Sequence, residues 1–539
     1  MKRTKKNDIL LAIFIFIIVF SVIIKKPLGD LDELWNYNTA RAISVGLIPY
    51  KDISMITTPL LPMATAIFLK IFADELIVSR ILAAVLWTGI LYTIYKIFRN
   101  LIKDENASLI LTTLIGLLCR DAYCIDYNGL ALFITLIIVY LELKNIDKLN
   151  SQNEKTENLK NNNIQINNIL ICNKKYEFLI GVLVGLVVCT KQSIGAVLAI
   201  MAVVYKLLFV KNKEDFKQYL KIAFTRILGI LFPFLILVIY LLATGALQDF
   251  INYAVLGIKT FSNKIEYRNL LENDKLEIKL LAILMPILII LTSIIIIVEV
   301  INDKKNKIKL KIEFLNLIVL FIYGISMIII MYPITDEIHF IIGMMISIIT
   351  IIYLVFAVGK NDNWIFKEKK LTQSTKKKIY KCYIIITDII CIVLFIFILE
   401  KAVTNLYNYS KVNKNKEINH YKNIEVSVGL SKRIKEVDNY ILENEKDGKK
   451  VYIVNADAAI YMIPIDKYNK NFDMLLKGNI GKDGEDGIIN NIKTSSNCLY
   501  LIMKPQYTQN WQTTTKIIDY IKNNFYFVDE ISIFDVYEK

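Results

Sequence analysis

The sequence predicts an α-helical polytopic membrane protein with a small α/β domain at its C-terminal end. Three observations support this fold class. The chain has 539 residues, of which 55% are hydrophobic, and its mean hydropathy is +0.45. Its apolar residues fall into blocks of roughly 17–25, the length that crosses the hydrocarbon core of a bilayer. After about residue 400 these blocks end and the composition becomes that of a soluble domain.

Eleven blocks are long and apolar enough to be considered as membrane spans. Segment 60–73 is shorter, lies beside Pro59 and Pro62 and carries Lys70, so we expect an interfacial helix there rather than a twelfth span. Segments 105–119, 177–190 and 194–210 are short for spans, and one long helix over 177–210 remains an alternative. The expected spans are 9–24, 76–98, 105–119, 128–143, 177–190, 194–210, 223–244, 277–301, 313–331, 338–359 and 380–400.

The distribution of basic residues predicts the orientation of the chain. With segment 60–73 on the surface, the loops on one side hold 31 Lys and Arg in 101 residues, and those on the other hold 10 in 88. Cytoplasmic loops carry the excess of basic residues. The N-terminus is therefore expected in the cytoplasm, and an odd number of spans places the C-terminal domain outside. We expect a multi-pass protein of the plasma membrane.

The N-terminal apolar block, Ile9–Ile24, is expected to be a retained first helix. It is followed by Lys25-Lys26-Pro27 and not by a small-residue cleavage site, which argues against a signal peptide. Residues 144–175 are rich in Asn and Lys and poor in apolar residues, so a disordered cytoplasmic loop is expected there.

Two compositional features exclude other classes of function. The formal net charge is +15, but the basic residues cluster beside the hydrophobic blocks, so no nucleic-acid partner is expected. The seven cysteines form no C-x-x-C pair, which argues against a cysteine-bound metal.

Residues 401–539 are predicted to form the soluble domain, and residues 1–400 the transmembrane domain. Strands are expected at 450–455 and 498–503, with a strand pair at 525–537, and helices at 457–462, 484–492 and 513–523. Strands alternating with helices favour an α/β domain. The run Gly481–Gly487 lacks the spacing of a calcium loop, so a solvated turn is expected there.

The first external loop, residues 25–75, carries the strongest chemical signal. Asp30, Asp32 and Glu33 stand immediately outside the first span, on a segment with helical periodicity over 32–45. A carboxylate packed beside Trp35 and Tyr37 would be partly desolvated, which raises its pKa and suits it to act as a general base. A solvated, helix-capping acidic cluster remains the alternative.

The order of motifs in this loop resembles the GT-C superfamily of membrane glycosyltransferases. Asp32-Glu33 is followed by G-x-x-P-Y-x-D at 46–52 and by T-P-L at 58–60. The resemblance is to the protein O-mannosyltransferase and lipid A aminoarabinose transferase type, and it covers the whole architecture. The family's second acidic motif resembles Arg120-Asp121 and the triplet 126–128, so its acid is either Asp121 or Asp126. Segments 190–193 and 332–339 resemble further family positions.

The resemblance implies an inverting transfer of a sugar from a polyprenyl-phosphate donor to an acceptor hydroxyl on the outer face. The loop 245–276, with Lys259, Lys264 and Arg268, could cover the donor or could simply be a positively charged surface loop. The implied catalytic residues are Asp32, Glu33 and Asp126, with Asp32 as the best candidate for the general base; the implied donor-phosphate ligands are Lys51, Arg120, Lys191, Arg268 and His339; other substrate-site residues are Asp30, Tyr50, Asp52, Tyr127, Asn128 and Tyr332.

Several alternatives remain open at this point. Lys191 could instead snorkel to the interface, and His339 could be a packed residue. A multi-span transporter or a non-catalytic cell-envelope assembly protein would share the many spans, although no internal repeat is evident. The acceptor could be a protein, a glycolipid or a wall polymer. The resemblance implies no obligatory cofactor; Asp32-Glu33 could hold a divalent cation, but no metal ligand is assigned.

Overall fold

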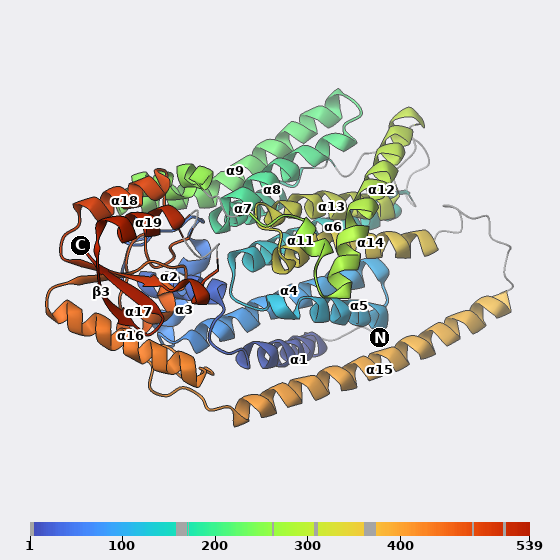
Figure 1. The fold of residues 1–539 in the computed structure, drawn as a ribbon. Coiled ribbons are helices and arrows are strands. Elements are labelled where there is room, and N and C mark those ends of the chain that lie inside the picture. The colour runs from blue at the N-terminus through green and yellow to red at the C-terminus, as the bar shows by residue number, and fades with distance from the viewer. Residues whose placement is uncertain are drawn as a thin grey trace.

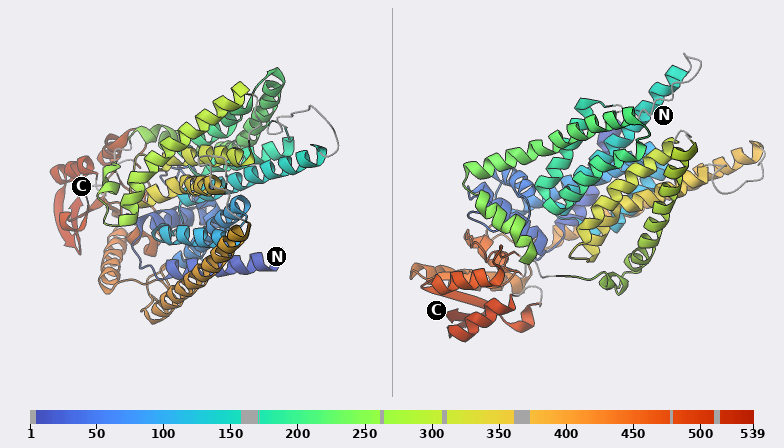
Figure 2. Two further views of the ribbon diagram at one scale, coloured as in Figure 1. Left: turned by 90° about the vertical axis from the view of Figure 1, so that its right-hand side faces the viewer. Right: turned by 90° about the horizontal axis from the view of Figure 1, so that it is seen from above.

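A computed structural model describes residues 5–157, 170, 172–260, 264–306, 311–360, 373–476, 479–509 and 514–539. A bundle of long helices forms most of the molecule, and the C-terminal domain lies at one end of it (Figure 1). Figure 2 shows the same arrangement from two further sides, with the long helix α15 (Gln373–Lys411) running along the bundle toward that domain. We call the end that carries the C-terminal domain the domain end.

The remaining helices and the strands have the following bounds. The helices are α1 Lys5–Ile24, α2 Leu31–Ser44, α3 Leu60–Ile71, α4 Leu76–Ile102, α5 Glu105–Leu118, α6 Tyr127–Glu157, α7 Lys174–Thr190, α8 Gln192–Val204, α9 Lys213–Ala243, α10 Leu247–Phe250, α11 Arg268–Leu271, α12 Leu276–Asn306, α13 Ile312–Met327, α14 Glu337–Lys360, α16 Val428–Lys446, α17 Ala458–Met462, α18 Gly484–Thr494 and α19 Thr515–Asn524; the strands are β1 Lys450–Ile453, β2 Cys498–Met503, β3 Tyr526–Ile531 and β4 Phe534–Glu538.

The long helices confirm a multi-pass membrane protein. Among the described residues, eight helices are long and apolar enough to cross a bilayer, and each coincides with a predicted span. The helices at the predicted spans 105–119 and 177–190 have 14 and 17 residues, and α15 contains the predicted span 380–400. Helix α3 has 12 residues. This is shorter than the roughly 20 residues that a spanning helix needs, as expected for segment 60–73.

Helices α7 and α8 are two antiparallel helices rather than one long helix. The chain leaves the helical conformation at Lys191, whose φ of −150° and ψ of 113° are extended. The two helices pack closely, because a Cβ atom built on Gly195 would lie 2.3 Å from the Cα atom of Val188. Arg226 donates hydrogen bonds to Glu177 at the start of α7 and to the Ala202 carbonyl at the end of α8, so these two ends are neighbours.

Small residues let α7 lie against α9. A Cβ atom built on Gly181 would meet the carbonyl oxygen of Arg226 at 2.2 Å, and one on Gly229 would meet the carbonyl oxygen of Phe178 at 2.4 Å. Gly181 and Gly185 form a G-x-x-x-G motif, which allows the backbones of membrane helices to approach closely. The contact therefore depends on the absence of side chains at these positions.

Four charged side chains are buried together inside the bundle, and we call them the buried ion cluster. Arg226 on α9 binds Glu142 on α6 at 2.6 Å and Glu177 on α7 at 2.5 Å. Lys206 lies 3.9 Å from Glu142, and Tyr205 donates a hydrogen bond of 2.9 Å to the same carboxylate. All four charged groups are at most 3% exposed, and their formal charges cancel. The cluster thus joins three spanning helices without a net buried charge.

The C-terminal domain is a four-stranded sheet between two layers of helices. The strand order is β1-β2-β4-β3, with β1 parallel to β2 and the other pairs antiparallel. Helices α16 and α17 pack with Val451 and Leu501 on one face, and α18 and α19 pack with Tyr500 and Ile502 on the other. The predicted strands and helices of this domain are confirmed, whereas α16 was not predicted.

Helix α2 of the first loop belongs to the core of the C-terminal domain as much as to the bundle. Its residues Leu34, Tyr37 and Ala40 are buried in the same apolar cluster as β1, β2 and β4. The indole of Trp35 donates a hydrogen bond of 2.9 Å to the Ala456 carbonyl. The domain boundary expected at residue 400 therefore divides the sequence, but α2, which precedes this boundary, packs into the core of the C-terminal domain.

Two loop expectations need comment. Residues 144–157 are the C-terminal part of α6, so the disordered loop expected from 144 was wrong there, and residues 158–169 and 171 lie outside the described residues. The long polar side chains of this segment favour helix once α6 has been nucleated in the bundle. In the run 481–487, Gly481 and Gly484 have φ of 74° and 61°, and Asp486 binds Lys516 at 2.5 Å. Residues 481–483 form the expected turn, whereas residues 484–487 are the first turn of α18.

We predict that Arg226→Met destabilises the bundle by about 3–5 kcal/mol, because it leaves the carboxylates of Glu142 and Glu177 buried without a counter-charge. Thermal unfolding of the purified protein in detergent measures this loss. Lys221→Met, at an exposed position of the same helix, is the matched control and should keep the parent melting temperature. Equal melting temperatures for the parent and Arg226→Met would contradict the prediction.

Candidate active site at the domain end

Four charged side chains from four separate segments come together at the domain end of the bundle. They are Asp32 at the start of α2, Asp126 before α6, Lys191 between α7 and α8, and His339 in the first turn of α14. The charges of Asp126 and His339 both act on Asp32, and the charges of Asp126 and Asp32 both act on Lys191. We call these four residues the acid–base group.

Asp32 stands in the first turn of α2. The helix begins after Asp30, whose side chain accepts a hydrogen bond of 3.2 Å from the backbone NH of Glu33. Burial, and then the nearby carboxylates of Asp126 and Asp30, raise the pKa of Asp32 to about 7. Such a group is partly ionised at neutral pH and can take up or release a proton there.

Asp126 is a buried carboxylate that the start of α6 holds in place. Its Oδ2 atom accepts hydrogen bonds from the backbone NH groups of Asn128 at 2.9 Å and Gly129 at 3.3 Å. Burial raises the pKa of Asp126, while His339, Lys191 and these two NH groups act in the opposite direction. The structure thus brings Asp126 beside Asp32, whereas Asp121, the other candidate for the second acid, forms an ion pair of 2.7 Å with Lys275.

Lys191 occupies the apex of the α7–α8 hairpin. Its Nζ atom donates a hydrogen bond of 3.0 Å to the side-chain oxygen of Asn128 and lies 4.7 Å from the centre of the Tyr127 ring. Burial lowers the pKa of Lys191 to about 8, against the attraction of Asp126 and Asp32. The predicted substrate-site residues Tyr127 and Asn128 therefore lie directly against this cation.

The first external loop is tied to the same hairpin. The Thr58 hydroxyl donates a hydrogen bond of 2.8 Å to the Val188 carbonyl at the end of α7. The Gln192 amide donates to the Ile56 carbonyl at 2.7 Å and to the Ala254 carbonyl at 2.8 Å. These bonds explain why the T-P-L motif and the Thr190–Ser193 segment are neighbours in space although they are far apart in the sequence.

His339 is fixed by the residue three positions before it. Its backbone NH donates a hydrogen bond of 2.8 Å to the Asp336 carboxylate, and its Nδ1 atom lies 2.9 Å from the same oxygen. A carboxylate at Nδ1 orients the ring and stabilises its protonated form. Asp336 was not among the predicted site residues, and its acceptor role at the N-terminus of α14 is a finding of the structure.

Glu33 has a different environment from Asp32. Its carboxylate forms a buried, two-pronged ion pair with Arg80 of α4, with hydrogen bonds of 2.9 and 2.8 Å. Arg80 also donates to the carbonyls of Lys26 and Pro27 at 2.5 and 3.2 Å. This arrangement fixes α2 on the bundle and uses both carboxylate oxygens, so Glu33 is left out of the acid–base group.

The predicted residues Tyr50 and Asp52 shape the first loop. The Tyr50 hydroxyl donates a hydrogen bond of 2.6 Å to the Thr57 carbonyl, and the Asp52 carboxylate accepts one of 2.7 Å from the Ile48 NH. Both groups therefore have partners within the loop itself.

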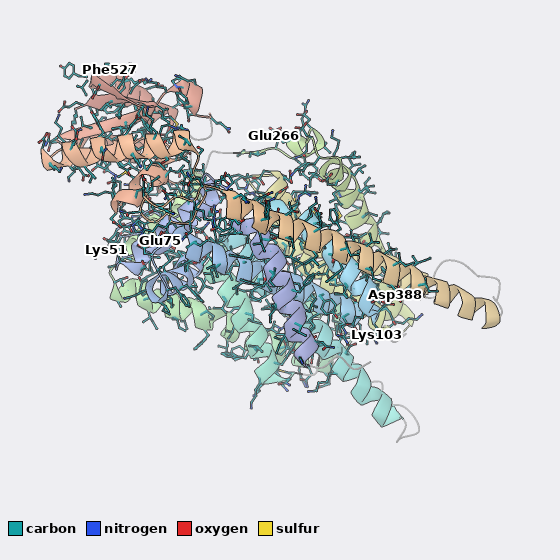
Figure 3. The ribbon with its side chains drawn as sticks, turned by 90° about the horizontal axis from the view of Figure 1, so that it is seen from below. Lys51, Glu75, Lys103, Glu266, Asp388 and Phe527 are labelled. Atoms are coloured by element: carbon teal, nitrogen blue, oxygen red, sulfur yellow. The ribbon has the colours of Figure 1, made fainter. Side chains whose placement is uncertain are left out.

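Four other predicted residues lie outside the acid–base group. Lys51, which is labelled in Figure 3, is exposed and donates a hydrogen bond to the Thr244 carbonyl at 3.4 Å. Arg120 is 56% exposed and lies 3.7 Å from Asp121, and Arg268 is 78% exposed and binds Glu272 at 2.7 Å. Tyr332 is 69% exposed. In the free protein these side chains are available to a ligand but are not held against Asp32.

The candidate cation site at Asp32-Glu33 gains no support from the geometry. Among the described residues, the group suited to a metal ion is Asp74, His420 and Asp466. The Arg41 guanidinium already lies in this group, with Nε 3.2 Å from Asp74 and Nη2 hydrogen-bonded to Asp466. The buried guanidinium of Arg41 would repel a metal ion at this position. The group therefore fits an ion-pair cluster that links α2 to the C-terminal domain better than it fits a metal site.

The sequence matches no protein-family model and no curated protein. Its structure is similar to that of ArnT from Cupriavidus metallidurans, with a TM-score of 0.50 in the apo state and 0.52 bound to undecaprenyl phosphate. In both cases the sequence identity is 10%, over 99% of this chain and 98% of ArnT.

A further similarity is to the Archaeoglobus fulgidus oligosaccharyltransferase that was crystallised with a tethered acceptor peptide. The TM-score is 0.45 and the identity is 13%, over 86% of this chain; the chain spans 63% of that longer protein. The whole-length match with ArnT confirms the predicted architecture. This chain has the fold of ArnT over its whole length.

Proposed function

We propose that this chain is a membrane glycosyltransferase that transfers a sugar from a polyprenyl-phosphate donor to an acceptor hydroxyl. The observation that carries the proposal is the acid–base group, in which two carboxylates and two basic side chains meet at one end of the bundle. ArnT, which has the same fold, has been solved with undecaprenyl phosphate, and this supports a lipid-phosphate donor. The predicted outward orientation of this end places the reaction on the outer face of the membrane.

Asp32 is the proposed general base. Its carboxylate takes the proton of the acceptor hydroxyl as the acceptor oxygen forms a bond to the anomeric carbon of the sugar. The bond from that carbon to the phosphate oxygen breaks, and its electron pair leaves with the lipid phosphate. Attack from the side opposite to the phosphate inverts the configuration. A pKa of about 7 suits this task, because the carboxylate is both ionised and sufficiently basic near neutral pH.

Lys191 and His339 are proposed to stabilise the leaving phosphate. Negative charge grows on that phosphate as the sugar departs, and fixed cations in a partly dehydrated site stabilise such charge strongly. Asp126 is proposed to keep both cations in place and to hold the pKa of Asp32 above its ordinary value. Exposed Lys51 and Arg268 are proposed to close on the donor only when it binds. The acceptor is a protein, a glycolipid or a wall polymer.

We predict that Asp32→Asn lowers the rate of transfer by about 10²–10⁴-fold, the usual contribution of a general base. The measurement is the transfer of radiolabelled sugar from a polyprenyl-phosphate hexose to a membrane extract by protein reconstituted in lipid. Glu266→Gln neutralises an exposed carboxylate of a predicted outer loop and should retain the parent rate. A rate of sugar transfer by Asp32→Asn equal to that of the parent would show that another carboxylate is the general base.

Lys191→Ala should weaken productive donor binding by about 10- to 100-fold, because hydrogen bonds to charged groups contribute on the order of 1.5–3 kcal/mol. The effect is expected in KM for the donor, with a smaller change in KM for the acceptor. Lys221→Ala, which removes an exposed lysine of α9 far from the acid–base group, is the control. A donor KM equal to that of the parent would remove Lys191 from the phosphate site.

The proposed roles predict a bell-shaped pH profile of kcat/KM. The rate should rise as pH passes about 7, where Asp32 becomes ionised, and fall above about 8, where Lys191 loses its proton. Lys191→Arg keeps its charge at all these pH values, so it should move the alkaline limb to higher pH and leave the acidic limb in place. An alkaline limb unchanged in Lys191→Arg would show that another group titrates there.

A further inference from the structure

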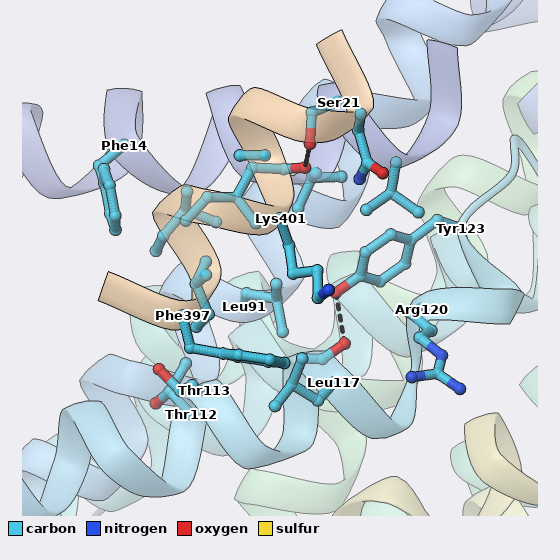
Figure 4. A pocket seen from close by; sticks show the side chains of 18 of the residues that line it. Phe14, Ser21, Leu91, Thr112, Thr113, Leu117, Arg120, Tyr123, Phe397 and Lys401 are labelled. Carbon is cyan, nitrogen blue, oxygen red and sulfur yellow. Dashed lines mark hydrogen bonds between the residues drawn. The ribbon is translucent and has the colours of Figure 1, made fainter. Parts of the chain in front are cut away.

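A cleft on the side of the bundle is separate from the acid–base group. It lies between α1, α4, α5 and α15, has a volume of about 570 Å³ and is lined by none of Asp32, Asp126, Lys191 or His339. Its inner walls are apolar, with Phe14 and Val22 from α1, Leu117 from α5 and Phe397 from α15 among the lining residues (Figure 4). A volume of this size holds an apolar chain of the length found in lipids or drug-sized ligands.

The mouth of the cleft is cationic. Its lining includes Lys25, Lys26, Arg120 and Lys401, and a single carboxylate, Asp121. That carboxylate is already paired with Lys275 at 2.7 Å. Arg120 and Lys401 are 56% and 57% exposed, and Figure 4 shows both side chains at the cleft. The lining therefore carries an excess of positive charge beside an apolar channel.

The position of these cations is unusual for this chain. Lys25 and Lys26 follow the end of α1, and Arg120 follows the end of α5. Lys401 lies on α15 shortly before the C-terminal domain, so all four cations stand at the domain end. This end corresponds to the predicted outer face, where basic residues are scarce elsewhere in the sequence. Basic residues that depart from the general distribution and gather around one apolar cleft indicate a bound anion with an apolar tail.

We propose that this cleft binds an anionic phospholipid of the surrounding bilayer. An acyl chain would lie between α1, α5 and α15, and the phosphate would be held by Lys25, Arg120 and Lys401. Lys25 donates one hydrogen bond, to Asn405 at 2.8 Å, and keeps two N–H groups for the phosphate. Lys26 is less available, since its Nζ atom donates two hydrogen bonds, to the carbonyls of Asp121 and Tyr123 at 3.2 and 3.0 Å. The site is a structural one, distinct from the proposed donor site.

The bound lipid would attach α15 to the rest of the bundle. Direct contacts of the described part of α15 include the stacking of Phe395 on Phe14 at 5.1 Å and a hydrogen bond of 2.8 Å from Lys25 to Asn405. Cys391 lies 3.6 Å from the Asn106 carbonyl. The same helix continues to Lys411 and leads into the C-terminal domain. A lipid in the cleft would thus connect the last span, and the domain that it carries, to α1 and α5.

Native mass spectrometry of the full-length protein, incubated in detergent with phosphatidylglycerol or phosphatidylcholine, tests the proposal. Phosphatidylglycerol should be retained selectively. The triple variant Lys25→Gln, Arg120→Gln, Lys401→Gln should bind it roughly a hundredfold more weakly, since each cation near an anionic lipid contributes on the order of fivefold. Thr113→Trp, which narrows the apolar part without changing charge, should also lose the lipid while keeping its transfer activity.

The matched control removes three exposed lysines outside the cleft, Lys411, Lys416 and Lys432, each replaced by Gln. This control should retain phosphatidylglycerol as the parent does. Equal retention of phosphatidylcholine, or unchanged retention of phosphatidylglycerol in the triple variant, would overturn the proposal. Displacement of the lipid by millimolar inorganic phosphate would also overturn it, because the cleft would then be a site for a free anion.

Discussion

The buried ion cluster is the constraint on which the arrangement of the domain end depends. Glu142 lies on α6 and Glu177 on α7, and Arg226 holds the two carboxylates together. Asp126 precedes α6, about 24 Å along the helix axis from Glu142, and Lys191 follows α7, about 21 Å from Glu177. Because the two distances are similar, fixing α6 and α7 to each other at the buried ion cluster places Asp126 and Lys191 at the same depth along the bundle axis.

Close packing transmits this register from one end of the bundle to the other. The G-x-x-x-G motif of α7 packs against Gly229 of α9. The two backbones can lie this close only where these glycines face each other, because any side chain at these positions would clash with the opposite backbone. Asp32 reaches the same level by a different route, through the ion pair of Glu33 with Arg80. The acid–base group therefore depends on contacts that include none of its own members.

How much of this could be predicted from the sequence depends on the range of the interactions. The spans, the surface helix α3 and the strands of the C-terminal domain were predictable, because hydrophobic runs and periodicity are local signals. The acidic residues of the first loop were recognisable from motif order. Asp32 was the preferred base from the sequence, but the different environments of Asp32 and Glu33 could not be predicted, because their partners, Asp126 and Arg80, lie far along the chain.

The remaining misses have the same physical origin. Lys206 and Arg226 occur in ordinary apolar or basic surroundings in the sequence, and only the packing of α6, α7 and α9 pairs them with carboxylates. The start of the loop expected at 144–175 was misplaced because the polar C-terminal part of α6 lacks the apolar periodicity that marks a span. Arg41, which is fully buried, could not be connected in advance with Asp466 of the C-terminal domain.

The attachment of α2 to the C-terminal domain has a consequence for biosynthesis. Trp35 and its partner Ala456 are 421 positions apart. At about 5–20 residues per second, synthesis of the intervening chain takes roughly 20–85 s. During this interval α2 has emerged and can form its ion pair with Arg80, but it lacks its contacts with the C-terminal domain. The apolar face of α2 formed by Leu34, Tyr37 and Ala40 is therefore covered only after the C-terminal domain has been synthesised.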